Sequence, residues 1–300
     1  MINKNTYINN INYEVSRVLG LLDKNKLSKT FGCFDRNYWH YKIKDFSSGM
    51  SQELTLVLAI VHETSYKSNK FYKNSKIKEY VESGIESAIY FSHSNGSTDD
   101  YYPYEKALGA TVFSLYALTE SYLLLDLKDE KFIDFFKLRA DWIINNEESG
   151  RLTNHHVIAA LSIFNLYLIT NDIKYKKAFY EKLEHVYSWQ TAEGWYWEYE
   201  GCDPGYLTVS IDFLAQIYKK TNDEKILLSL KNSITFFYNI QHPDGTAGGE
   251  YGSRNTLVFH PAGFEIMSSY NDQALKISNS YLTALDSELL ANIADDYIIG

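Results

Sequence analysis

The chain has 300 residues, of which 45% are hydrophobic, and its formal net charge is −9. This length and apolar content suffice for a sizeable core, and only four prolines interrupt possible helices. Because the net charge is negative and the basic residues form no block, nucleic acid is not an expected partner. The sequence has no apolar stretch long enough to span a membrane, and its first residues lack the pattern of a secretion signal, so a cytoplasmic location is expected.

Residues 1–50 are expected to form an N-terminal segment that carries one site loop, and residues 51–300 a helical array within the same structural domain. From residue 52 onward, apolar residues recur at spacings of three and four, which is typical of helices. Mostly apolar helices are predicted at 52–63, 105–124, 155–169 and 206–219. Helices with lysines and glutamates along one side are predicted at 76–91, 130–145, 174–189 and 224–240.

A short polar motif separates the two helices of each pair. It begins at Asn74, Asp129, Asp172, Asp223 and, in a looser form, Asp272. A motif that recurs roughly every fifty residues marks a supersecondary unit that cannot bury its apolar face alone. Because Asp is a strong helix N-cap, Asp129, Asp172 and Asp223 are predicted to cap the helices that follow them.

A glycine follows each of the first four motifs after 21 or 22 residues, at Gly96, Gly150, Gly194 and Gly245. Their constant position predicts that each glycine opens a longer loop to the next hairpin, and that all the longer loops emerge on one face. An apolar helix followed by an amphipathic one, repeated, favours an all-α fold: an α/α toroid of about five hairpins forming an incomplete ring. An open solenoid of stacked hairpins is the main alternative.

The longer loops carry most of the unusual side chains, and loops on a rigid scaffold are where binding and catalysis usually occur. Tyrosine and tryptophan rings beside carboxylates suit the faces and hydroxyls of sugars, although simple packing also accounts for such rings. The residues expected to contact a ligand are Asp35, Arg36, Trp39, His40, Asp100, Tyr104, Trp195, Trp197, Tyr206 and Glu250.

The segment 99–105, Asp-Asp-Tyr-Tyr-Pro-Tyr-Glu, has two interpretations. Pro103 and the acidic residues favour a helix start, whereas the carboxylates and tyrosines favour the rim of a cleft. Glycoside hydrolysis needs two carboxyl groups, and the sequence does not select a pair. The loops offer Asp99, Asp100, Glu105, Glu198, Asp203 and Glu250.

Asn154, His155 and His156 stand where a loop becomes a helix. Asn154 is well suited to be the N-cap of that helix. Successive helical residues point about 100° apart, so at most one of the two histidines faces a cleft. A histidine in that position exchanges protons near neutral pH; the alternative is a buried, hydrogen-bonded histidine.

The segment 248–255, Gly-Gly-Glu-Tyr-Gly-Ser-Arg-Asn, lets the backbone approach a ligand closely. Arg254 is suited to hold a substrate carboxylate through two N–H groups, with an internal ion pair to Glu250 or Asp244 as the alternative. Together with Arg36 and Arg151, it predicts a small group of arginines that recognises acidic sugars.

The sequence favours neither a metal site nor a cofactor. Cys33 and Cys202, with His155 or His156, could supply three zinc ligands, but no Cys-x-x-Cys or Cys–His spacing supports a zinc site. Motifs that cradle phosphate are also missing from the sequence. We therefore expect chemistry carried by side chains alone.

The hairpin array, with Asn154-His155-His156 opening one helix and residues 95–102 opening another, resembles the toroid domain of heparinase II/III-like and alginate-lyase-like polysaccharide lyases over roughly residues 50–290. The first loop, 32–41, also looks like that of uncharacterised proteins from bacterial surface-polysaccharide gene clusters. The resemblance implies that Asn154 neutralises a uronate carboxylate with help from Arg254, and that His155 or His156 is the base. It implies an acid chosen among Tyr102, Tyr104 and Tyr251.

We therefore expect a β-elimination lyase that acts on uronate-containing bacterial oligo- or polysaccharides. Such a reaction needs donors aimed at the carboxylate as the enolate develops, and a base positioned at the α proton. A glycoside hydrolase that uses two of the carboxylates is one alternative. A non-catalytic glycan-binding protein of polysaccharide assembly is the other.

Overall fold

The computed structural model describes residues 5–252, 259–287 and 289, and in this part of the chain it contains helices but no strand. All eight predicted helices are present, with ends within three residues of those predicted. The elements are α1 (Asn5–Leu21), α2 (Arg36–Trp39), the 3-10 helix η1 (Gly49–Glu53), α3 (Leu54–Glu63), α4 (Ser75–Phe91), α5 (Leu108–Leu124), α6 (Glu130–Asn145), α7 (Thr153–Thr170), α8 (Ile173–Ser188), α9 (Pro204–Thr221), α10 (Glu224–Ile240), α11 (Ala262–Met267) and α12 (Asp272–Asp286).

The chain forms two compact units. Among the described residues, the N-terminal unit comprises Asn9–Glu147 and Ser162–Ala178, and the C-terminal unit comprises residues 5–8, Glu148–Leu161, 179–252 and 259–287. The α7–α8 hairpin contributes residues to both units. The expected division into residues 1–50 and 51–300 remains a prediction.

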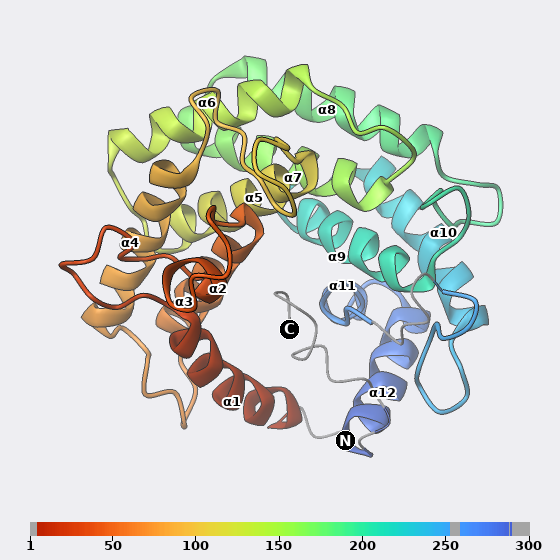
Figure 1. Ribbon diagram of the computed structural model, residues 1–300. Coiled ribbons are helices and arrows are strands. Elements are labelled where there is room, and N and C mark those ends of the chain that lie inside the picture. The colour runs from red at the N-terminus through yellow and green to blue at the C-terminus, as the bar shows by residue number, and fades with distance from the viewer. Residues whose placement is uncertain (1–4, 253–258, 288, 290–300) are drawn as a thin grey trace. The chain divides into compact units, whose positions relative to one another are not determined.

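Within each unit the helices form two layers (Figure 1). In the N-terminal unit, α3 packs on α5, and α4 packs on α6. In the C-terminal unit, α9 packs on α11, and α10 packs on α12. First helices therefore contact first helices and second helices contact second helices, which is the arrangement predicted for apolar and amphipathic helices in alternation.

The polar motifs are the short turns inside the hairpins, and their first residues are N-caps. The side chains of Asn74, Asp129, Asp172 and Asp223 each accept a hydrogen bond of 2.8–3.0 Å from the amide two residues later. This confirms the predicted caps. The fifth motif is shifted by one residue, because Asn271 rather than Asp272 caps α12.

Three of the four evenly spaced loop glycines, Gly96, Gly194 and Gly245, lie in the same kind of turn. In each turn the glycine N–H donates to the backbone carbonyl three residues earlier. The turns are His93–Ser97, Thr191–Trp195 and His242–Thr246. A Cβ atom added to Gly96, Gly194 or Gly245 would lie 2.8, 2.4 or 2.2 Å from a backbone atom of α6, α10 or α12. Each glycine therefore lets its loop pack directly on the second helix of the hairpin that follows.

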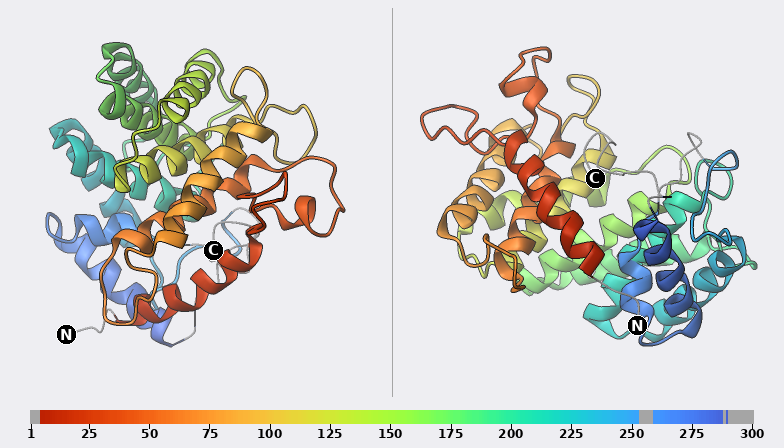
Figure 2. Two further views of the ribbon diagram at one scale, coloured as in Figure 1. Left: turned by 90° about the vertical axis from the view of Figure 1, so that its left-hand side faces the viewer. Right: turned by 90° about the horizontal axis from the view of Figure 1, so that it is seen from below.

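Besides η1, three elements were not expected from the sequence. Helix α1 fills much of the N-terminal segment and runs as one continuous helix (Figure 2). The first loop contains the single-turn helix α2. Helix α11 is only 6 residues long, so the fifth hairpin has a short first helix.

Candidate functional site

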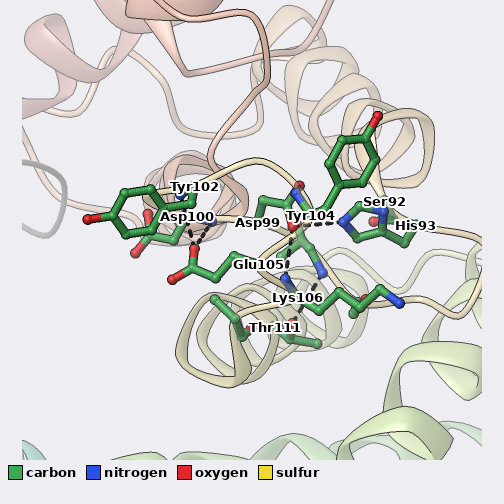
Figure 3. Close-up of polar contacts among 12 residues, drawn as sticks. Ser92, His93, Asp99, Asp100, Tyr102, Tyr104, Glu105, Lys106 and Thr111 are labelled. Carbon is green, nitrogen blue, oxygen red and sulfur yellow. Dashed lines mark hydrogen bonds and ion pairs between the residues drawn. The ribbon is translucent and has the colours of Figure 1, made fainter.

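In the N-terminal unit, the loop between α4 and α5 is organised by two carboxylates (Figure 3). Asp99 accepts hydrogen bonds from the amides of Tyr104 and Lys106, at 2.8 and 2.9 Å, and lies 2.7 Å from Nε2 of His93. Glu105 Oε2 accepts from three consecutive amides, those of residues 100–102, at 2.9–3.3 Å. These bonds hold Tyr104 and Lys106 at positive φ, a strained conformation often found at functional sites.

Asp100 belongs to a second group of carboxyls at the base of this loop. Its Oδ1 accepts a 2.6 Å hydrogen bond from the hydroxyl of Ser48, and the amide of Gly49 donates to the carbonyl of Asp99. Burial raises the pKa of Asp100 despite the Ser48 bond. Burial, and then the charge of Asp100, raise the pKa of Glu53, whose Oε1 is buried without a partner among the described residues. The first loop and the α4–α5 loop thus meet at a site that favours protonated carboxyls.

The pKa of Asp99 is shifted in the opposite direction. Burial opposes its ionisation, but the hydrogen bonds from His93 and from the two loop amides outweigh burial and lower the pKa of Asp99. Beside it, Tyr101, Tyr102 and Tyr104 are 69%, 71% and 82% exposed. Of the two interpretations of residues 99–105, the helix start at Pro103 is not observed, because Asp99 and Glu105 fold the segment into a turn and α5 begins at Leu108.

The expected ligand residues of the first loop have internal partners. Asp35 is buried, caps α2, accepts from the amide of Ser48 at 2.9 Å and pairs with Lys44 at 3.2 Å. The Arg36 guanidinium lies 5.9 Å from the ring centre of Trp39 and donates to the carbonyl of Gly20. Trp39 Nε1 donates to the carbonyl of Leu21, and the ring of His40 packs between Trp39 and Tyr41. These contacts give the residues structural roles, and a role in binding a ligand stays a prediction.

In the C-terminal unit, Tyr251 is the most chemically distinctive side chain of the α10–α11 loop. It is 53% exposed, and its hydroxyl oxygen lies 2.7 Å from Nε2 of His242 and 3.1 Å from the amide nitrogen of Gly248. His242 Nδ1 in turn lies 2.7 Å from the hydroxyl of Thr246, which donates to Asp244. Glu250 is exposed beside Tyr251, whereas Arg254 lies outside the described residues.

Asn154 is not the N-cap of α7, which begins one residue earlier, at Thr153. Its amide Nδ2 donates to Glu198 Oε1 at 2.6 Å, and its backbone N–H donates to Glu198 Oε2 at 3.1 Å. Both side chains are buried, with relative exposures of 1% and 3%. Asn154 therefore joins α7 to the α8–α9 loop and does not reach solvent, which argues against its expected contact with a uronate carboxylate.

The two histidines after Asn154 differ sharply. His156 is buried against His185 and Trp189 of the α8 region, with ring centres 5.0 and 4.7 Å away. Burial, with Lys182 and His185 nearby, lowers the pKa of His156 to about 3, and neither ring nitrogen has a partner in the described part of the chain. A base must accept a proton, so this arrangement argues against His156 in that role. His155 is partly exposed, and its Nδ1 lies 2.8 Å from Glu148.

The α8–α9 loop carries an aromatic surface. Trp195 and Trp197 pack edge to face at 5.1 Å, and Tyr199 and Tyr206 lie 5.2 Å apart. The Arg151 guanidinium lies 3.7 Å from the ring centre of Trp197 and pairs with Glu200. The group of arginines expected from the sequence is therefore engaged by internal partners at Arg36 and Arg151.

Sequence reasoning missed His93, His242 and Glu53. A signal for the two histidines exists in retrospect, since 93–97 reads His-Ser-Asn-Gly-Ser and 242–246 reads His-Pro-Asp-Gly-Thr. A hollow of about 460 Å³ lies at the opposite end of α5 from its loop, between Leu123, Leu127 and Leu168, away from these side chains. Among the described residues, no three His, Cys, Asp or Glu side chains are grouped to hold a metal. No described helix is both long and apolar enough to span a membrane.

The fold has been seen in several solved structures. A cellobiose 2-epimerase from Bacillus thermoamylovorans aligns with a TM-score of 0.69 and 13% identity over 94% of this chain and 88% of its own. A polysaccharide lyase aligns with a TM-score of 0.63 and 11% identity over 92% of this chain and 45% of its own. An unsaturated glucuronyl hydrolase from Streptococcus agalactiae, complexed with dGlcA-GalNAc6S, aligns with a TM-score of 0.58 and 14% identity over 83% and 69%.

These likenesses confirm the all-α, α/α-toroid fold class predicted from the repeated hairpins. The sequence itself matches no family model and no curated protein. At identities of 11–14%, the comparisons establish the fold alone. Function must therefore be argued from the side chains.

Proposed function

We propose that the protein is a carbohydrate-active enzyme that cleaves uronate-containing oligo- or polysaccharides by β-elimination, with Tyr251 as the group that moves the proton. The observation that carries this proposal is the exposed Tyr251 hydroxyl, 2.7 Å from His242 Nε2 and 3.1 Å from the Gly248 amide nitrogen. A tyrosine that has both a proton acceptor and an N–H donor at its oxygen is suited to lose and regain its proton.

In this reaction Tyr251 takes the proton from C5 of the uronate, next to the carboxylate. The electron pair of that C–H bond forms the C4–C5 double bond as the C4–O bond breaks. The leaving oxygen then takes a proton from Tyr251, so the enzyme returns to its initial state. This assignment differs from the histidine base expected from the sequence. His156 is buried with a lowered pKa, and Nδ1 of His155 is paired with Glu148, whereas the hydroxyl of Tyr251 belongs to a half-exposed side chain.

The substrate class is supported by two of the structural neighbours. One is a polysaccharide lyase, and another is an unsaturated glucuronyl hydrolase in complex with dGlcA-GalNAc6S, a sugar that carries a carboxylate. Arg254 remains the proposed partner of the substrate carboxylate. The rings of Trp195, Trp197 and Tyr206 are proposed to contact sugar faces.

Glycoside hydrolysis is the second candidate, because Asp99 and Asp100 have opposite pKa shifts. Two neighbouring carboxyls whose pKa values are shifted in opposite directions are suited to acid–base cleavage of a glycosidic bond. In this alternative Asp100 is the proton donor, and the exposed rings of Tyr102 and Tyr104 hold the sugar.

The products distinguish the candidates. The protein is incubated with a panel of uronate polysaccharides and with neutral oligosaccharides, and both the ultraviolet absorbance of the C4–C5 double bond and new reducing ends are measured. We expect both signals from uronate substrates only. Reducing ends without the absorbance would replace the lyase by the hydrolase, and binding without either signal would leave a glycan-binding protein.

Variants connect the activity to the residue. Tyr251→Phe removes the hydroxyl and keeps the ring, so elimination should fall by roughly a hundredfold or more while the fold is retained. Tyr90→Phe, at an exposed tyrosine on α4, is the matched control and should behave as wild type. Elimination activity that survives in Tyr251→Phe would remove Tyr251 from the mechanism.

A further inference from the structure

Four side chains of the α10–α11 loop form a continuous hydrogen-bonded series. Asp244 Oδ1, Thr246 Oγ1, the two nitrogens of His242 and the Tyr251 hydroxyl follow one another at 2.7 Å per contact. Thr246 is buried and His242 is partly buried, whereas Asp244 and Tyr251, at the two ends of the series, are exposed, so the phenol can be reached from solvent.

The direction of each hydrogen bond follows from Asp244, the acceptor at the start of the series. The hydrogen bonds from Thr246, first from its amide and then from its hydroxyl, lower the pKa of Asp244, so its carboxylate only accepts. The single hydroxyl hydrogen of Thr246 therefore points to Asp244. His242 Nδ1 must then donate to Thr246 Oγ1, because that oxygen has no second hydrogen to give.

A neutral imidazole that donates from Nδ1 has its lone pair on Nε2. The Tyr251 hydroxyl must therefore donate to Nε2, and the Gly248 N–H donates to the same phenolic oxygen. Gly248 and Gly249 both have a φ of 89°, a conformation that glycine adopts without strain and that brings this amide to the phenol.

We propose that Asp244, Thr246 and His242 form a directed proton relay, in which His242 Nε2 takes the proton of Tyr251 and so prepares Tyr251 to abstract a proton from the substrate. His242 is in this scheme a catalytic residue of the proposed elimination, and Thr246 and Asp244 are positioning residues. The catalytic step of this inference rests on the proposed function, whereas the direction of the hydrogen bonds does not.

The proton count closes over one cycle. Tyr251 gives its proton to Nε2, which leaves a phenolate held by the Gly248 N–H and an imidazolium held by Thr246 and Asp244. The phenolate takes the C5 proton, the C4–C5 double bond forms, and the C4–O bond breaks. Tyr251 then gives a proton to the leaving oxygen and regains one from Nε2.

The corresponding loop of the N-terminal unit supplies an internal comparison. His93 and Ser97 occupy the positions of His242 and Thr246, and the amide of each histidine donates to the carbonyl four residues later. His93 Nε2, however, faces the carboxylate of Asp99, and the Ser97 hydroxyl donates to Asn95. The same turn therefore holds a histidine–carboxylate pair in one loop and a histidine–phenol pair in the other.

The first test needs no substrate. Nitrogen-15 NMR of the histidine rings in the free protein should show His242 as the neutral tautomer with its proton on Nδ1. Thr246→Val removes the acceptor and should shift the proton to Nε2, whereas Thr246→Ser keeps the hydroxyl and should preserve the wild-type signal. A wild-type His242 with its proton on Nε2 would overturn the relay.

The second test measures activity on whichever uronate substrate the wild type cleaves. Thr246→Val should lower kcat by about tenfold or more and shift the pH profile, with KM nearly unchanged, and Thr246→Ser should restore both. Ser97→Ala, at the equivalent turn position, should leave the profile unchanged. If the tautomer is as stated but no uronate is cleaved, the proposed function fails; if cleavage occurs and Thr246→Val is fully active, the relay fails.

Discussion

Arg139, on α6, donates from Nε to the carbonyl oxygen of Gly96 at 2.8 Å, so a fully buried guanidinium is bonded to the turn that opens the α4–α5 loop. Its other nitrogens donate to the hydroxyls of Ser114 and Ser92. Burial lowers the pKa of Arg139 to about 9, which still leaves it charged at neutral pH. One side chain therefore joins α4, α5, α6 and the loop that holds Asp99.

Replacing Arg139 by Lys tests whether its three hydrogen bonds stabilise the fold. A lysine ammonium cannot reach three acceptors in the geometry of a guanidinium, so buried acceptors lose their partner. We expect the free energy of unfolding to fall by about 2–4 kcal/mol, measured by urea denaturation. Arg17→Lys, at an exposed ion pair on α1, should change it by less than about 0.5 kcal/mol. Equal stability of the two variants would mean that the three hydrogen bonds do not hold the loop.

The helix caps give a second prediction. Asp129→Ala and Asp223→Ala each remove a side-chain acceptor from the first turn of α6 or α10, and each should cost about 1 kcal/mol of unfolding free energy. Activity should not change, because the caps lie at the short turns rather than at the longer loops. Lost activity at unchanged stability would place function at the short turns.

The glycine turns give a third prediction with a built-in control. Gly194 and Gly150 both have positive φ, 105° and 114°, but only at Gly194 would a Cβ overlap a neighbour, 2.4 Å from the carbonyl oxygen of Asn232. Gly150→Ala should cost roughly 1–2 kcal/mol from backbone strain alone. Gly194→Ala should cost about 1–3 kcal/mol more because of the overlap. Chemical denaturation of both variants checks this, and similar losses would show that packing on α10 is loose.

The raised pKa of Glu198 predicts that the stability of the fold depends on pH. Burial raises its pKa from 4.5 to about 8 against the hydrogen bonds from Asn154, and Asp203 adds to the increase. The folded protein therefore binds this proton more tightly than the unfolded chain. The stability it contributes is fully present below pH 4.5 and is lost progressively as the pH rises to about 8.

The Glu198→Gln variant isolates this effect, because glutamine stays neutral at every pH and retains an acceptor for the Asn154 amide. Relative to wild type, the variant should become more stable as the pH increases from 5 to 9, by a difference on the order of several kcal/mol. Urea midpoints across this range measure the difference. Glu193→Gln, at an exposed carboxyl of the same loop, should show no such trend, and a pH-independent difference for Glu198→Gln would mean that Glu198 is ionised throughout.

The fold was accessible to sequence reasoning because its signals are local. The caps at Asp129 and Asp223 and the glycines that follow them act within a few residues of their own positions, so their spacing alone located the hairpins. Helix α1 was missed because its stripe of Val15 and Val18 is short and lies among polar residues. The register error at Asn271 arose because Asn and Asp are both good caps and stand side by side.

The candidate site was less accessible, because its contacts depend on loop geometry without a regular period. His242 and Tyr251 are nine residues apart, and only two consecutive glycines at positive φ bring them together. The sequence also does not show which side chains are buried. Asn154 and His156 lie at the expected end of α7, yet both side chains are buried. Arg139 lies on a helix predicted to be amphipathic, and no pattern in the sequence shows that its side chain is buried.

The packing of each loop glycine on a later helix also sets an order of events during synthesis on the ribosome. The carbonyl of Gly96 can accept its hydrogen bond only after Arg139, 43 residues further on, has been synthesised. The carbonyl of Gly194 likewise needs Ser233, 39 residues further on. Because the ribosome adds roughly 5–20 residues per second, each loop stays without this contact for several seconds, until the hairpin that follows it has emerged. The segments that carry Asp99 and Glu198 are therefore anchored only after the later helix has been made, and a nascent chain stalled at a short turn should expose them to proteases.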